Sequence, residues 1–128
     1  MAYEASQVRF GNLTAAADLS SKQYHFVKLA SATTVNVCTA ITDLPIGILQ
    51  NNPESGETAT ITIFGISKVV ADGTLAAGNI IGTSADSQAD AIVAGTDTTV
   101  YAMGQAVTAG SAGETTTMFL NPSNARSA

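Results

Sequence analysis

The apolar residues of this chain occur in short alternating runs that end at turn residues, and this pattern most constrains the fold. In the clearest run, residues 58–70, Ile61 and Ile63 alternate with threonines, as is typical of a half-buried β-strand. Similar short runs rich in β-forming residues lie at 23–29, 34–39, 46–50, 80–83, 91–93, 98–103, 105–107 and 115–120. No segment has the 3.6-residue periodicity of an amphipathic helix. The sequence therefore predicts a mainly β protein.

Turn residues separate these runs at short intervals. The cluster Asn-Asn-Pro-Glu-Ser-Gly occupies residues 51–56, and Ala-Asp-Gly-Thr occupies 71–74. Gly65 interrupts the longest run, which predicts a bulge or a sharp bend of the kind that closes small barrels. Turn signals at this spacing are typical of barrels and sandwiches, so we expect a small β-barrel or β-sandwich of about eight short strands.

The length of 128 residues fits one domain with short extensions. We expect an extended N-terminal arm at residues 1–12, a β domain at 13–120 and a short polar C-terminal tail at 121–128. In and next to the arm, Val8, Phe10 and Leu13 are isolated apolar residues in polar surroundings. They are candidate contacts with a partner, to which the arm could add a strand. The alternative is a disordered segment.

The composition predicts a core of modest stability. Hydrophobic residues make up 45% of the chain, but many of them are alanines. Burial of an alanine side chain stabilises the folded state far less than the ~1.5–3 kcal/mol gained by burying a leucine, isoleucine or phenylalanine. We therefore expect added burial, in an oligomer or on a larger body, to stabilise the fold.

The charge of the chain argues against nucleic acid and membrane as partners. The net charge is −5, and the five lysines and arginines are scattered, whereas phosphate binding needs clustered cations. No apolar run reaches the length of about 18 residues that suggests a membrane span. The first residues lack the pattern of a secretory signal, and one cysteine suits a reducing compartment. We expect synthesis in the cytoplasm.

Few residues could carry chemistry. His25 and Cys38 are the only residues of their types, and no nucleophile motif accompanies either one. One His and one Cys cannot form a tetrahedral zinc site within the chain. Asp86, Asp90 and Asp97 are spaced too widely for a calcium loop. We therefore expect no catalytic residues, no metal and no cofactor, with a site shared between subunits as the open alternative.

Several segments together resemble the small capsid decoration (cement) proteins of tailed bacteriophages. They lie at residues 17–28, 45–51, 65–71, 75–79, 103–106 and 120–122. The most distinctive are Lys-Gln-Tyr-His-Phe-Val-Lys at 22–28 and Pro-Ile-Gly-Ile-Leu-Gln-Asn at 45–51. The resemblance covers nearly the whole chain after the arm. It departs at Asn79, where the family often has Asp, and in the loop 84–97.

The resemblance implies a mainly β protein on the outer surface of an icosahedral virion. Such proteins bridge neighbouring subunits of the major capsid protein and stabilise the expanded shell against the pressure of the packaged DNA. They usually act as oligomers, so the implied partners are the major capsid protein and further copies of this chain, with a trimer favoured over a dimer. An oligomer that engages several weak sites at once gains avidity.

The main alternative is a virion-borne β module that binds a host receptor or glycan. Sugar sites usually present exposed aromatic rings beside polar groups. Only Tyr3, Tyr24 and Tyr101 could serve, and Tyr24 lies on a predicted core strand. An enzyme or a free-standing cytosolic binding domain ranks below both.

Overall fold

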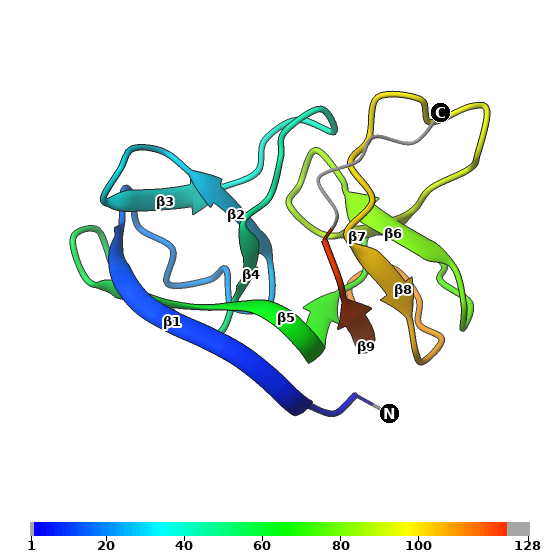
Figure 1. Ribbon diagram of the computed structural model, residues 1–128, viewed down its shortest axis with the longest axis horizontal. Coiled ribbons are helices and arrows are strands. Elements are labelled where there is room, and N and C mark those ends of the chain that lie inside the picture. The colour runs from blue at the N-terminus through cyan, green and yellow to red at the C-terminus, as the bar shows by residue number, and fades with distance from the viewer. Residues whose placement is uncertain (1, 123–128) are drawn as a thin grey trace.

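The computed structural model describes residues 2–122, so the predicted tail lies outside it from residue 123 onward. Within this range the chain forms nine β-strands and no helix (Figure 1). The strands are β1 (Ala5–Ala15), β2 (Phe26–Leu29), β3 (Thr34–Val37), β4 (Gly47–Leu49), β5 (Thr58–Val70), β6 (Ile80–Thr83), β7 (Ala89–Ala91), β8 (Gly104–Ala106) and β9 (Thr115–Leu120). The prediction of a mainly β protein is confirmed. None of the described residues form a helix that could span a membrane.

The strands form one mixed sheet in the order β1-β3-β2-β4-β5-β9-β8-β6-β7. The β1–β3 pair is parallel, and the other pairs between these strands are antiparallel. Because β1 also pairs with β5, the first five strands make a closed cycle of pairings. Figure 1 shows β1–β4 in one half of the molecule and β6–β9 in the other, with β5 running through both.

One core cluster belongs to the closed cycle, and all five of its strands contribute to it. Its buried members are Leu13, Ala15, Leu19, Val27, Val35, Leu49, Ala59 and Ile61. A second cluster joins β2 and β4 to the other half of the sheet. It consists of Phe26, Cys38, Ile48, Val69, Ala71, Leu75, Ile81, Ala89, Met103, Ala106, Met118 and Leu120.

Strands β2 and β4 serve both clusters because successive side chains of a strand point to opposite faces. Phe26 and Ile48 belong to one cluster, whereas their neighbours Val27 and Leu49 belong to the other. All four side chains are completely buried. The two strands therefore form a shared wall between the clusters.

The segment predicted to be an arm is extended, but it lies along the protein's own body. Residues 5–12 form most of β1, which pairs antiparallel with β5 and continues past residue 12 without a break. The backbone N–H of Tyr3 also donates to Thr117 Oγ1 at 2.7 Å. The pairing has a physical reason: without β1, one edge of the long strand β5 would be left without a hydrogen-bond partner.

Strand β5 changes partners at Gly65. Thr62 and Ile61 pair with β4, whereas the residues from Gly65 onward pair with β9. Gly65 has φ +115°, a backbone conformation that residues other than glycine rarely adopt. The irregularity predicted at this glycine is therefore the point where β5 passes from one half of the fold to the other.

Candidate interaction surface

His25 is buried, and both nitrogens of its ring lie near polar groups. Its Nδ1 is 3.1 Å from the carbonyl oxygen of Gln23, and its Nε2 is 3.4 Å from the side-chain nitrogen of Gln88. An Nδ1 that donates to the carbonyl leaves Nε2 free to accept from the amide. Burial lowers the pKa of His25, and the nearby Lys22 adds to the effect. This environment holds the imidazole neutral and in a fixed orientation.

The buried imidazole predicts that stability falls in mild acid. Because the folded-state pKa lies below the ordinary value near 6.5, the unfolded chain binds the proton more readily. Above about pH 6.5, neutral His25 makes its full contribution to the free energy of unfolding. This contribution is lost as the pH falls below that value. Urea unfolding measured from pH 5 to 7.5 should show this loss, and His25→Gln should flatten the slope. An equal slope in the variant would assign the effect to other groups.

Cys38 is buried, and burial together with the nearby Asp43 raises its pKa to about 12. A thiol with such a pKa stays protonated at neutral pH and is a poor nucleophile.

Among the described residues, no three histidine, cysteine, aspartate or glutamate side chains group together to hold a metal ion. Burial raises the pKa of Asp90, and the charge of Asp72 adds to this shift. Asp97 accepts the backbone N–H of Val93 at 2.8 Å.

Large apolar side chains do gather on one face of the sheet. The exposed ones among the described residues are Tyr3, Val8, Leu29, Ile41, Leu44, Phe64, Ile80 and Val93. Three of these, with the half-buried Phe119, follow one another across neighbouring strands and form what we call the apolar band: Val8, Phe64, Phe119 and Ile80. Val8 is 50% and Phe64 43% exposed.

The sheet register brings the four side chains of the apolar band together. Val8 on β1 pairs with Phe64 on β5, and the ring of Phe64 meets that of Phe119 edge to face, with 5.6 Å between centroids. Gln105 on β8 pairs with Phe119 on one side and with Ile80 on the other. The band therefore runs over β1, β5, β9, β8 and β6, with one polar side chain in its path.

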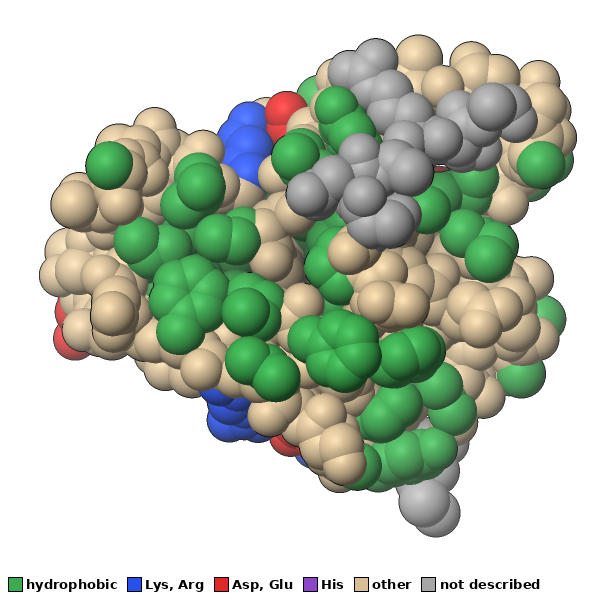
Figure 2. All heavy atoms as spheres, in the orientation of Figure 1, with side chains coloured by type: hydrophobic (Ala, Val, Ile, Leu, Met, Phe, Trp, Pro, Cys, Tyr) green, Lys and Arg blue, Asp and Glu red, His purple; other side chains and the backbone are tan. Residues whose placement is uncertain are grey.

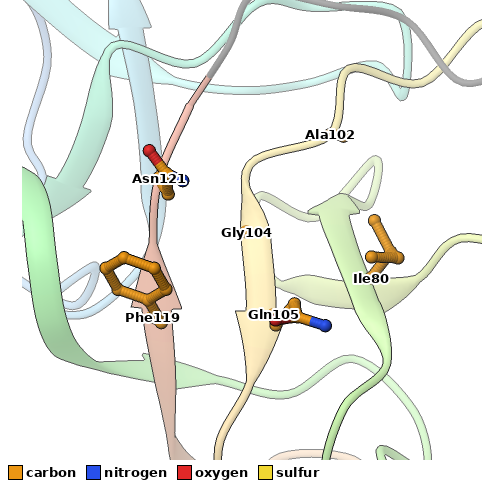
Figure 3. Close-up of a pocket in the computed structure, with 6 residues that line it drawn as sticks. All are labelled: Ile80, Ala102, Gly104, Gln105, Phe119 and Asn121. Atoms are coloured by element: carbon orange, nitrogen blue, oxygen red, sulfur yellow. The ribbon is translucent and has the colours of Figure 1, made fainter.

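A hollow of about 250 Å³ opens in the band where β8 begins. Its lining residues are Ile80, Ala102, Gly104, Gln105, Phe119 and Asn121. Figure 3 shows Phe119 and Ile80 on the strands to either side of the one that carries Gly104 and Gln105. Gly104 has φ +146°, and a Cβ there would meet the backbone oxygen of Phe119. A residue with a side chain at this position would therefore collide with the backbone at the end of β9.

Charged side chains are absent from the band. Figure 2 shows hydrophobic side chains spread across this face and charged ones only towards its borders. Near Val8, Arg9 and Glu4 of the N-terminal segment form an ion pair with 2.8 Å between Arg9 Nη2 and Glu4 Oε2. The face is thus apolar in its centre and polar at its rim, as protein interfaces commonly are.

A second apolar depression, of about 460 Å³, lies beside β2. Its lining residues are Lys28, Leu29, Leu44, Pro45, Ile46 and Pro122. Lys28 Nζ lies 2.9 Å from Asp43 Oδ2, so the charge at this depression is paired. Leu29 and Leu44 leave large parts of their side chains exposed.

The structure places the three predicted contact residues in different environments. Val8 is exposed within the band, and Phe10 is half-buried against the core cluster of the closed cycle. Leu13 is only 8% exposed and is a member of that cluster. As folded, Leu13 faces the protein's own interior rather than a partner, because β1 packs on β5 instead of extending away. Of the three side chains, that of Val8 has the largest exposed fraction.

The tyrosines considered for a glycan site do not form one aromatic platform. Tyr24 packs against the second core cluster, with Lys68 Nζ 5.7 Å from its ring centroid. Tyr3 is exposed near the start of the chain and Tyr101 is half-buried.

The arrangement of the strands is known from another protein. No family model and no curated protein matches the sequence. Among solved structures, the crystal structure of the head fiber gp8.5 N base of bacteriophage phi29 matches with a TM-score of 0.65. The match covers 91% of this chain and 95% of that chain at 16% sequence identity. The protein shares its fold with the base of a phage head fiber. At this identity the match shows the fold alone.

Proposed function

We propose that this protein is a capsid decoration protein that binds the outer surface of an icosahedral phage head and bridges major capsid subunits. Two independent observations support the proposal. Its fold is that of a protein described as the base of a bacteriophage head fiber. Separately, its sequence segments from residue 17 to 122 resemble phage decoration proteins. We further propose that the closed cycle of five strands is a small barrel.

The apolar band is the observation that carries an adhesive function. Each Å² of apolar surface removed from water contributes about 25 cal/mol, so half-exposed side chains give a modest gain per copy. Self-association, as a trimer rather than a dimer, multiplies the gain because one oligomer engages several capsid sites at once. In this mechanism the protein reinforces the expanded shell by holding neighbouring subunits together.

We propose that the N-terminal part of β1 contributes to the capsid contact through Val8. Its side chain is half-exposed, and the strand around it is irregular, with register shifts on both sides of Val8. Deleting residues 2–12 would test this contact poorly, since it would also strip β5 of a paired strand. A point substitution at Val8 leaves that pairing in place.

Co-sedimentation with empty, expanded phage heads tests the proposed function. The purified protein should sediment with the shells and raise the temperature at which they break open. Val8→Ser should weaken the binding several-fold, because it removes exposed apolar surface from the contact. Val93→Ser is the matched control, since Val93 is at least as exposed as Val8 but lies outside the band.

Two results would count against this function. One is a protein that stays in the supernatant at saturating concentrations. The other is a shell whose resistance to heat is the same with and without bound protein.

A further inference from the structure

We propose that the turn at residues 84–88, which joins β6 to β7, is a latch that mild acid releases. The turn docks on the segment that contains His25, and protonation of that imidazole opens it. The inference goes beyond the proposed function, because neither the latch nor its test involves a capsid. Figure 1 shows β6 ending towards the half of the molecule that holds β2, which is the side that this turn contacts.

Two polar contacts dock the turn on the start of β2. The backbone N–H of Phe26 donates to the carbonyl oxygen of Ser87 at 2.7 Å. Next to it, the side-chain nitrogen of Gln88 lies 3.4 Å from Nε2 of His25. Both contacts join the second half of the sheet to the segment that leads into β2. The turn therefore reaches from β6 and β7 across to the other half of the fold.

The turn can move as a unit, and its docked conformation favours release. Ser84 Oγ accepts the backbone N–H groups of Asp86 at 3.1 Å and of Gln88 at 3.2 Å, so the turn has its own internal hydrogen bonds. Ser87 has φ +61°, a left-handed conformation that is uncommon for a residue with a side chain. A hollow of about 370 Å³ between the turn and the end of β3 leaves room for movement.

His25 makes the docked turn sensitive to acid, because a charged imidazole is poorly accommodated there. Its side chain is buried, and Nδ1 already faces the carbonyl oxygen of Gln23 at 3.1 Å. A proton on Nε2 would put a donor opposite the amide nitrogen of Gln88. Turning the amide oxygen towards the ring would restore a hydrogen bond but would leave the charge buried. Water reaches the ring when the turn moves away, so protonation favours the open form.

The charged groups around His25 do not compensate a cation. Lys22, in the same segment, disfavours protonation, and no carboxylate of the described residues shifts the pKa of His25. The turn contributes one charged residue, Asp86, whose side chain is exposed. Strand β4 contributes none. The end of β5 contributes Lys68, whose Nζ lies over the ring of Tyr24.

Labelling of Cys38 tests the latch. It is the only cysteine of the chain, is buried, and lines the same hollow as the turn. Dipyridyl disulfide labels thiols in neutral and in acid solution, and its rate with glutathione at each pH corrects for the intrinsic reactivity of a thiol. The corrected rate should rise roughly tenfold from pH 7.5 to pH 5, because the open form binds the proton with an ordinary pKa near 6.5. His25→Gln should remove this rise.

Two further variants separate the latch from general unfolding. Gln88→Glu places a carboxylate beside the imidazolium, so the docked form would bind the proton and the corrected rate should fall in acid. Val35→Cys, with Cys38→Ala, puts the thiol in the buried cluster of the closed cycle. At pH 5 it should react roughly tenfold more slowly than Cys38, because its exposure requires global unfolding.

Four results would overturn the proposal. The first is a corrected rate of the wild type that does not change with pH, and the second is an equal rise in His25→Gln. The third is a Gln88→Glu variant with the same pH dependence as the wild type. The fourth is labelling of Val35→Cys as fast as that of Cys38, which would assign the acid effect to unfolding of the whole chain.

Discussion

Replacing Gly65 with alanine is expected to destabilise the protein by about 2–5 kcal/mol. The left-handed conformation at φ +115° costs a residue with a Cβ about 1–2 kcal/mol. The added Cβ would also meet the backbone oxygen of Ser6 and lie 2.8 Å from Gln7 Cα. Overpacking of this kind typically adds a further 1–3 kcal/mol. Urea unfolding monitored by circular dichroism measures the loss.

Gly56→Ala is the matched control for this substitution. Gly56 also has a positive φ, +84°, but nothing lies within 4 Å of the position that a Cβ would take. Gly56→Ala should therefore lose only the conformational contribution of about 1–2 kcal/mol. If the two variants lose equal stability, the close approach of β1 to Gly65 adds nothing to the cost of a side chain at this position.

The strands with the strongest local pattern were predictable from sequence. The run at residues 58–70 is β5, and the run at 80–83 is β6, both with the predicted bounds. The run at 91–93 overlaps β7 only at Ala91, and the segment 98–103 contains no strand although Val100 and Met103 are buried. In such short segments the partner strand decides the structure, and the partner is distant in sequence.

Strand β1 shows why the N-terminal segment was interpreted as an arm. Between Ala5 and Asn12 its side chains are exposed or half-buried, so no alternation of apolar and polar residues marks it as a strand. Its register with β5 also shifts three times, which breaks any regular pattern. The pairing depends on the open edge of β5, which the local sequence of residues 5–12 does not reveal.

The band was only partly predictable for a related reason. Alternation along β5 places Phe64 on the face opposite Ile61 and Ile63, so its exposure could have been inferred from the pattern. The same holds for Phe119, which lies between the buried Met118 and Leu120. Their meeting with Val8 and Ile80 depends on the strand order β1-β5-β9-β8-β6, which follows from long-range pairing.

Phe26→Ala is expected to destabilise the protein by about 3–5 kcal/mol, as is usual when a fully buried phenylalanine is truncated. Phe26 is completely buried in one core cluster, and its neighbour Val27 lies in the other. Leu49→Ala, on the other shared strand, should cost about 2–5 kcal/mol from the opposite cluster. Because β2 and β4 belong to both clusters, either loss should weaken the whole described fold in one transition.

Chemical unfolding followed by both near- and far-ultraviolet circular dichroism distinguishes one cooperative unit from two. Each variant should lower the midpoint while the two probes stay coincident and the slope with denaturant is unchanged. Leu44→Ala is the control, since Leu44 is exposed and its truncation should change stability by about 0.5 kcal/mol at most. Two separate transitions, with Phe26→Ala shifting one and Leu49→Ala the other, would mean that each cluster is stable without the other. The shared wall of β2 and β4 would then be a contact between two units and would not couple their folding.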